Sequence, residues 1–166
     1  RFSIKDRSWH TYTGLTHDKG AFGNFPGGEV YVAPIEDSAN GVVFWDKTMP
    51  SIGVLRTSVK AIFKKGRITS IEGGEEATKL SNMIRNVKGA DTIAEFGIGA
   101  NPMARLQGNL FTDEKVLGTV HIAIGDNVRI PIGGTNKCEL HVDGVIGNPT
   151  VTINGKTIIR NGELLI

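Results

Sequence analysis

Short apolar segments separated by glycine are the feature that most restricts what this chain can fold into. Glycine occupies 22 of the 166 positions, where about 7% would be usual, so tight turns are frequent. The apolar segments between these turns have the length of strands rather than of helices. They comprise residues 29–34, 41–46, 59–63, 68–71, 91–98, 120–124 and 139–146. The alternating tail, residues 150–165, adds two hairpin turns at Asn154-Gly155 and Asn161-Gly162.

Two segments are expected to be helical. In residues 75–87, apolar side chains recur on one stripe, from Ala77 to Val87. Residues 112–117 are expected to form a short helix with Thr112 as its N-cap, whereas residues 1–27 are polar and turn-rich. The sequence therefore predicts an α+β fold for residues 1–166 as a single domain, with a mostly antiparallel or mixed β-sheet, one main helix and short helical turns.

The composition argues against several classes of protein. The formal net charge is +2 and the basic residues form no stripe, so nucleic acid is not an expected partner. Cys138 is the only cysteine, which rules out an internal disulfide. No apolar run approaches the ~18–20 residues that span a bilayer, so we expect no membrane contact and a cytoplasmic location. Because the chain begins at Arg1 without a methionine, we expect it to be part of a longer protein.

The segment Cys138–Gly144 (CELHVDG) places an imidazole and a carboxylate two residues apart within an apolar run. Residues i and i+2 of a strand point to the same face, so His141 and Asp143 are expected to lie side by side. Burying both groups is costly unless a partner satisfies them, and a divalent metal ion does so. This pair is therefore the first candidate for metal ligation.

Three more segments each carry one ionisable side chain in an apolar, glycine-flanked setting: Glu29, Glu95 and His121. The alternative for each glutamate is a surface carboxylate on an edge strand, and for His121 a hydrogen-bonded core histidine. In IAEFGIG, the expected same-face neighbours of Glu95 are Ile93 and Gly97.

The five candidate ligands form a set that is rich in oxygen and imidazole and lacks thiolate: Glu29, Glu95, His121, His141 and Asp143. Such a set suits zinc, manganese, cobalt or non-haem iron. A single catalytic zinc needs about three protein ligands, so two ions about 3.5–4 Å apart would use the set better. A pair of ions would polarise a carbonyl group and lower the pKa of a bridging water.

Other candidates carry less weight. Cys138 is expected to be a small buried apolar residue, and His10 and His17 to be loop histidines, with His17 a minor candidate for lining a site. Glu36-Asp37 is expected to be a turn with solvated charge, with binding of a substrate amine as the alternative. The glycine-rich segments match neither a dinucleotide fingerprint nor a P-loop, and there is no GxSxG element.

Four motifs, taken in order, resemble the M29 family of metallo-aminopeptidases, the aminopeptidase T group: FPGGEVYVAP, IAEFGIGANP, DEKVLGTVHIAIG and LHVDGVIGNPTV. The likeness runs from about Gly20 to Ile159 and corresponds to the C-terminal catalytic part of that family, whose N-terminal domain is missing here. The resemblance implies a pair of metal ions held by the same five residues, with Glu29 near the bridging water. It also implies a tyrosine shortly after the first histidine. Here Gly125–Val128 (GDNV) contains none.

Three hypotheses follow for function. The first is a metal-dependent hydrolase of aminopeptidase type with two ions (zinc, cobalt or manganese) and Glu29 as general base or bridging ligand. The second, suggested by a sister group, is a ring-cleaving dioxygenase of dihydroxypyridine with one Fe(II), whose two-histidine, one-aspartate site would include His141 and Asp143. The third is a non-catalytic module with a vestigial metal site. The expected partners are a peptide or small-molecule substrate, the missing N-terminal domain and, as a homodimer, a second copy of the chain.

Overall fold

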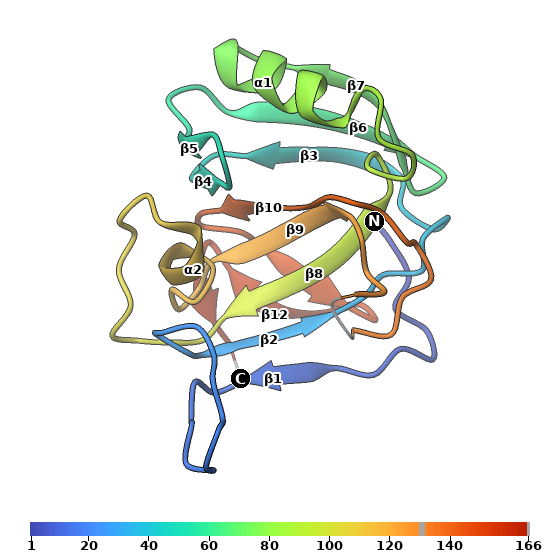
Figure 1. Cartoon of the computed structure of the whole chain (residues 1–166). Coiled ribbons are helices and arrows are strands. Elements are labelled where there is room, and N and C mark those ends of the chain that lie inside the picture. The colour runs from blue at the N-terminus through green and yellow to red at the C-terminus, as the bar shows by residue number, and fades with distance from the viewer. Residues whose placement is uncertain (130–131, 166) are drawn as a thin grey trace.

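A computed structural model of the chain describes residues 1–129 and 132–165. Its strands are β1 (His10–Tyr12), β2 (Glu29–Val32), β3 (Gly41–Trp45), β4 (Thr48–Met49), β5 (Gly53–Val54), β6 (Val59–Lys64), β7 (Arg67–Glu72), β8 (Ile93–Gly99), β9 (Val120–Gly125), β10 (His141–Ile146), β11 (Val151–Ile153), β12 (Lys156–Arg160) and β13 (Glu163–Leu164). Its helices are α1 (Glu75–Ile84) and α2 (Leu110–Asp113). The predicted α+β fold with mostly antiparallel strands is confirmed (Figure 1).

A five-stranded antiparallel sheet organises the molecule, with strand order β1-β2-β8-β9-β10. The β3-β6-β7 sheet stands beside its β10 edge, with α1 packed on β6 and β7 (Figure 1). Two smaller sheets, β11-β12-β13 and β4-β5, complete the fold. Strand β1 lies in the N-terminal segment that the sequence describes only as polar and turn-rich; pairing with β2 makes it a strand.

The helices are shorter than the sequence predicts. Helix α1 buries Ala77 and Leu80 as expected, but it ends at Ile84 instead of Val87. Helix α2 begins earlier than predicted, because Asn109 rather than Thr112 is its N-cap: the Asn109 side chain accepts a hydrogen bond from the Phe111 amide at 3.1 Å. No helix in residues 1–129 and 132–165 is both long and apolar enough to cross a bilayer.

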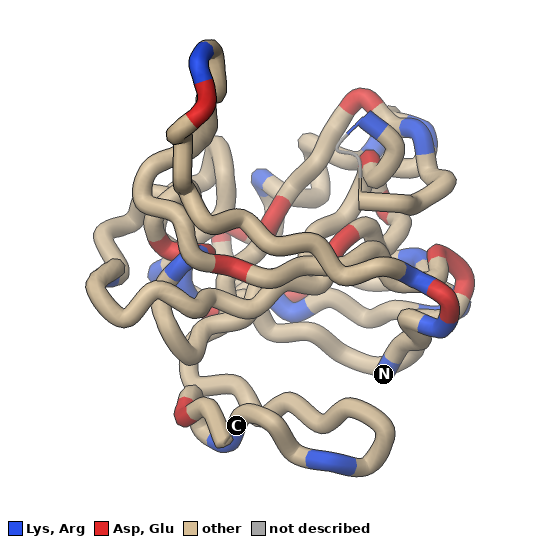
Figure 2. The backbone as a smooth tube through the Cα atoms, turned by 90° about the horizontal axis from the view of Figure 1, so that it is seen from below, with Lys and Arg blue, Asp and Glu red and all other residues tan. Residues whose placement is uncertain are grey.

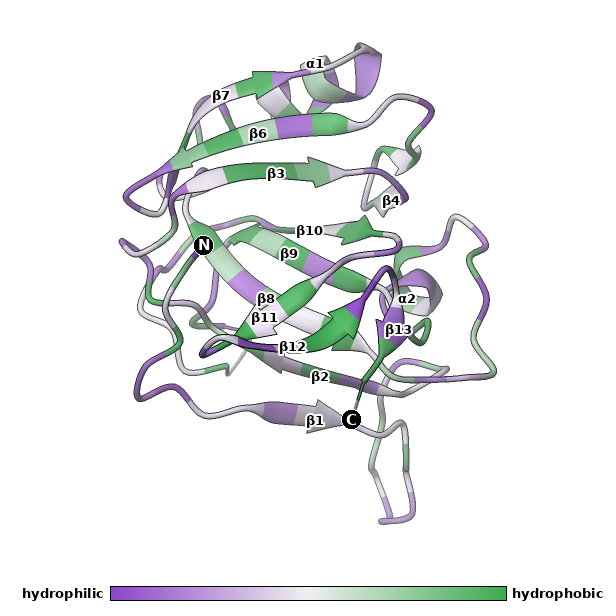
Figure 3. Cartoon of the chain, turned by 180° about the vertical axis from the view of Figure 1, so that it is seen from behind, coloured by the Kyte–Doolittle hydropathy of each residue, from purple (hydrophilic) through white to green (hydrophobic). Residues whose placement is uncertain are grey.

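The core lies between the sheets and centres on Trp45, which is fully buried. Its indole N–H donates to the Ile122 carbonyl at 3.1 Å, and its ring lies directly over Gly144, where a Cβ atom would come within 2.1 Å of it. Figure 3 shows mainly hydrophobic strands in this region, with hydrophilic stretches interrupting β8 and β9. Strands β8 and β9 contain Glu95 and His121, two of the ionisable residues of the candidate site.

Candidate metal centre

Antiparallel register brings the predicted ligands onto one face of the five-stranded sheet. Glu29 on β2 pairs with Gly99, and Glu95 on β8 pairs with Ala123, which in turn pairs with Asp143 on β10. His121 on β9 faces Gly97. Strand alternation then directs the five predicted side chains to the same side, while the intervening apolar residues enter the core.

Glu95 is buried, with 6% of its surface exposed, and β8 has a neighbouring strand on each side. The edge-strand alternative for Glu95 is therefore wrong. Gly97 shares its face as predicted, but Ile93 does not, because a bulge between Ile93 and Glu95 shifts the register by one residue. A bulge depends on how the partner strands align, which the alternating pattern of a single strand does not reveal.

Glycine at position 97 makes room for the imidazole of His121. A Cβ atom at Gly97 would lie 1.9 Å from His121 Nε2, far inside van der Waals contact. The ring can therefore lie flat above the backbone of β8. In this position its Nε2 atom is 3.2 Å from Glu95 Oε1 and 3.6 Å from Glu29 Oε2.

His141 joins Glu95 and Asp143 in one compact group. Its Nε2 atom lies 3.2 Å from Asp143 Oδ2 and 3.5 Å from Glu95 Oε2. The other ring nitrogen, Nδ1, hydrogen-bonds to the Asp126 carbonyl oxygen at 2.6 Å. A carbonyl can only accept, so Nδ1 carries the hydrogen, and this contact orients Nε2 towards the carboxylates.

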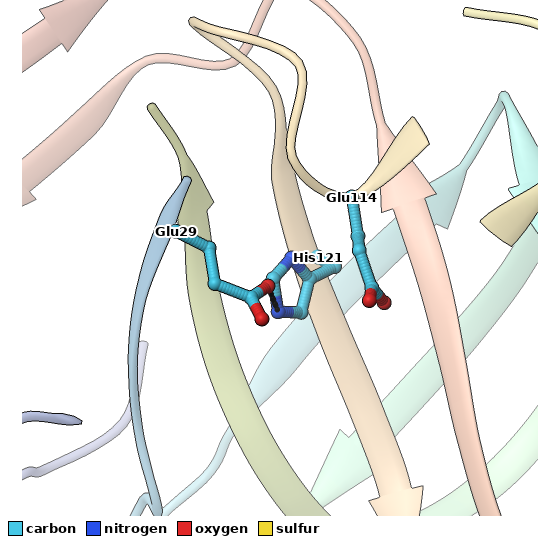
Figure 4. Close-up of side chains that lie close together, drawn as sticks. All are labelled: Glu29, Glu114 and His121. Carbon is cyan, nitrogen blue, oxygen red and sulfur yellow. Dashed lines mark ion pairs between the residues drawn. The ribbon is translucent and has the colours of Figure 1, made fainter. Parts of the chain in front are cut away.

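Two functional residues, Glu114 and Lys115, were missed by the sequence analysis. They follow α2 and are both buried, with Lys115 only 1% exposed. The Lys115 ammonium pairs with Glu29 Oε1 at 2.7 Å and, even more closely, with Glu114 Oε1. Figure 4 shows Glu29 and Glu114 on either side of the His121 ring. The available signal was the unbroken DEK run just before a buried strand.

Close packing of these charges shifts their protonation equilibria. Burial alone would lower the pKa of both imidazoles, but the neighbouring carboxylates outweigh it. Glu95 above all raises the pKa of His121 to about 9, and Asp143 above all raises that of His141 to about 10. Burial, reinforced by Asp143, raises the pKa of Glu114 to about 7. Burial also raises the pKa of Glu29, despite the nearby His121 and Lys115 charges that oppose the shift.

A cavity of about 420 Å³ opens over this cluster. Its described lining residues are Tyr12, Asn24, Glu29, Tyr31, Pro50, Glu95, Leu110, Phe111, Glu114, Lys115, His141 and Asp143. The tyrosine that the resemblance implies shortly after His121 is absent, but two other tyrosines, Tyr12 from β1 and Tyr31 from β2, line the cavity. This placement could not be read from spacing, because it depends on the pairing of β1 with β2.

The remaining sequence candidates lie elsewhere. Neither His10 nor His17 belongs to the described lining of the cavity. His10 lies in strand β1 rather than in a loop, and its ring stacks on that of Tyr31 in β2. Cys138 is buried, as expected. Glu36 and Asp37 lie in a turn, as predicted, and Asp37 is exposed, but Glu36 is partly buried and forms an ion pair with Arg7 at 2.6 Å. Figure 2 shows acidic and basic residues interspersed along the described backbone.

The donor set fits a divalent cation. Two groups have ligand atoms within 4.8 Å of one another: Glu95, His141 and Asp143 form one, and Glu29, Glu114 and His121 the other. Glu29 Oε2 and His121 Nδ1 are buried and have no hydrogen-bond partner among the described residues. Buried polar atoms without partners are costly, and oxygen with imidazole is a donor set that zinc, manganese, cobalt and iron accept.

Comparison with known proteins defines the class. The family model described as thermophilic metalloprotease (M29) matches residues 2–165. The chain therefore belongs to the M29 family, and the resemblance stated from its motifs is confirmed.

Two curated relatives carry different names. The chain is 25% identical to 2,5-dihydroxypyridine 5,6-dioxygenase of Pseudomonas putida, over 93% of this chain and 48% of that protein. It is 26% identical to aminopeptidase PepS of Streptococcus thermophilus, over 86% of this chain and 40% of that protein. The chain thus spans about half the length, or less, of these relatives.

Two solved structures share the fold. The dihydroxypyridine dioxygenase of Pseudomonas putida KT2440 has a TM-score of 0.84 at 24% identity, covering 96% of this chain and 49% of that one. AmpT of Thermus thermophilus has a TM-score of 0.74 at 21% identity, covering 96% and 45%.

Proposed function

We propose that this chain is a metal-dependent hydrolase of aminopeptidase type, which removes the N-terminal residue of peptides. The observation that carries the proposal is the acidity of the cavity. Four carboxyl groups line it (Glu29, Glu95, Glu114 and Asp143), and Lys115 is the one lysine or arginine among its described lining residues. One of these carboxyl groups can pair with the free terminal ammonium of a substrate. The cavity volume lies within the ~300–1,000 Å³ typical of small-molecule sites.

Glu95, His141 and Asp143 are the proposed ligands of a divalent ion, with His121 and Glu29 beside them. When bound, such an ion polarises a substrate carbonyl and lowers the pKa of a bound water. His141 is oriented for ligation by its Nδ1 contact with the Asp126 carbonyl. Zinc, manganese and cobalt are the candidate ions.

Glu29 is the proposed general base. Its Oε1 atom is held by Lys115 at 2.7 Å, whereas its buried Oε2 atom has no hydrogen-bond partner among the described residues. Burial raises its pKa, so it retains a proton more readily than an exposed carboxylate. Glu114, with a pKa of about 7, is a second group that can carry a proton near neutral pH. Tyr31, on the cavity wall, is the proposed donor to the developing oxyanion.

The test is hydrolysis of a panel of aminoacyl chromogenic substrates by protein loaded with zinc, manganese or cobalt. We expect release of the chromophore, its loss on chelation and in Glu95→Ala, and no cleavage of N-acetylated substrates, because acetylation removes the ammonium. Glu29→Gln should lose turnover while still binding metal. Absence of hydrolysis across the panel by metal-loaded protein would refute the proposal.

The second candidate is a ring-cleaving dioxygenase with one Fe(II). Its support is the named dioxygenase relative, together with the positions of His121 and His141 beside Glu95 and of Asp143 beside His141. Two histidines and one aspartate are compatible with a two-histidine, one-carboxylate site. Oxygen uptake with 2,5-dihydroxypyridine and ferrous iron, without aminoacyl hydrolysis, would favour this candidate over the hydrolase.

We further propose that residues 1–166 are one catalytic-type domain of a longer protein and that the chain forms a homodimer. The first proposal is supported by the share of the relatives that the chain covers, which is 48% and 40% for the two named above. Light scattering of the purified chain at several concentrations tests the second. A monomer at every concentration would refute it.

A further inference from the structure

We propose that the Lys115 ammonium occupies the position of one of the two metal ions that the donor set could otherwise hold, so that each chain binds a single divalent ion at Glu95, His141 and Asp143. This inference rests on the proposed metal site but not on hydrolysis. It replaces the expectation of two ions, which came from counting ligands without knowing where the nearby cations lie.

The ammonium bridges two of the three members of the second ligand group. Lys115 Nζ is 2.7 Å from Glu29 Oε1 and in close contact with Glu114 Oε1, and both carboxylates stand beside His121. A second ion among these residues would have to share oxygens with a positive charge in direct contact with them. Repulsion between an ammonium and a dication at that separation is strong, because Lys115 and Glu114 are buried and water screens their charges poorly.

Lys115 cannot readily leave this position. Its side chain is 1% exposed, and its ammonium also lies 5.6 Å from the centre of the Tyr12 ring, a favourable cation–π distance. Its backbone is held on both sides: its N–H donates to the Thr112 carbonyl at 3.1 Å, and its carbonyl accepts from the Asn101 amide at 2.8 Å. Moving the ammonium to solvent would remove the cation that contacts both the Glu29 and the Glu114 carboxylate.

Asp113, two residues before Lys115, anchors the same turn. The Asp113 carboxylate accepts hydrogen bonds from the Thr48 hydroxyl at 2.5 Å and from the amides of Gln107 and Gly108 at 2.7 and 2.9 Å. Asp113 therefore ties α2 to β4 and to the loop before α2. Glu114 and Lys115 are directed into the cavity by this tie.

The other ligand group has no such internal cation. In the described part of the chain, the carboxylates of Glu95 and Asp143 form ion pairs only with the rings of His121 and His141, and no lysine or arginine lies within ion-pair distance of either carboxylate. An imidazole nitrogen can donate a lone pair to a metal ion, whereas an ammonium group has none to donate. The single ion is therefore expected in this group.

The test is the number of manganese ions bound per chain, measured by equilibrium dialysis with elemental analysis, together with the Mn(II) electron paramagnetic resonance spectrum. The wild-type chain should bind one equivalent and show the six-line spectrum of an isolated ion. Glu29→Gln should still bind one, and Glu95→Gln should bind at least about tenfold more weakly, as expected for loss of a direct ligand.

Lys115→Met removes the ammonium and keeps most of the side-chain volume. It should raise the count to two and produce a spin-coupled spectrum, whereas Lys60→Met, which breaks an ion pair with Glu72 remote from the cavity, should leave one. Two equivalents or a coupled spectrum in the wild type would overturn the proposal, as would no bound ion or loss of the ion in Glu29→Gln. If Lys115→Met does not fold, the wild-type count and the glutamate variants still decide. A count of one without hydrolysis would refute the proposed function and leave this inference standing.

Discussion

Gly97→Ala is a sharp test of how the sheet builds the site. The new Cβ atom would lie 1.9 Å from His121 Nε2. To restore an ordinary contact of 3.4 Å, the ring or the strand must move by about 1.5 Å, the difference between the two distances. Such a shift breaks the 3.2 Å contact between His121 and Glu95.

The expected cost has two parts. Overpacking of a buried site typically destabilises by ~1–3 kcal/mol. For a chain of this size, that corresponds to a decrease in Tm of roughly 2–12 °C. Loss of the group that supports Glu95 should also weaken manganese binding by about 10–100-fold, as for other residues that position a ligand. Thermal unfolding of the metal-free protein and manganese titration measure the two parts separately.

Gly74→Ala is the matched control. Gly74 is the N-cap of α1, its φ is negative, and a Cβ atom there would meet only side-chain atoms, at 3.3–3.4 Å. This variant can lose some stability through a poorer cap, but its manganese affinity should equal that of the wild type. If Gly97→Ala kept both its Tm and its manganese affinity, the placement of the His121 ring above β8 would be refuted.

Three further predictions concern other parts of the molecule. Thr48→Val removes the hydroxyl that donates to Asp113 and should lower the free energy of unfolding, measured by urea denaturation, by ~1–3 kcal/mol. Thr48→Ser keeps the hydroxyl and serves as the control. Equal stability of the two variants would contradict the role of this hydrogen bond. Burial works to raise the pKa of Glu36, but the Thr135 amide, the Asn127 side chain and the Arg7 charge outweigh it and hold the pKa below its usual value. The contribution of Glu36 to stability is therefore present above its unfolded-state pKa and is lost as the pH falls through its folded-state pKa. Glu36→Gln should accordingly flatten the acid limb of a plot of unfolding free energy against pH. An unchanged slope would contradict this. Because the pKa of His141 is raised to about 10, metal binding at about pH 7 must displace its proton. Calorimetry in buffers of different ionisation enthalpy should therefore detect proton release, and the affinity for the metal should rise with pH. Binding that does not depend on pH would contradict ligation by this histidine.

The candidate ligands that lie on strands were largely predictable, because the alternation of side chains along a strand is a local property of the sequence. His141 and Asp143 are two residues apart, so their shared face follows from the sequence alone. Glu95 and His121 stood out because each interrupts an apolar run that tertiary structure buries. Gly97 was expected beside Glu95, and the structure shows it there, making room for His121.

What the sequence left out depends on contacts between distant segments. Glu114 and Lys115 follow a four-residue helix, whose position is set by the bond between Asp113 and Thr48 across 65 residues of chain. The bulge next to Glu95 arises from the alignment of β8 with β9, and so the position of Ile93 was mispredicted. No periodicity within one segment carries such information. The proposal of a single ion depends on the position of Lys115, which no periodicity reveals either.

Anomalous scattering from manganese-loaded crystals is the most direct test of the central claim, that this sheet face holds a divalent ion. The account predicts one strong peak per chain within coordination distance of Glu95, His141 and Asp143, with the Lys115 ammonium still between Glu29 and Glu114. A peak among Glu29, Glu114 and His121, or no peak at either group, would contradict it.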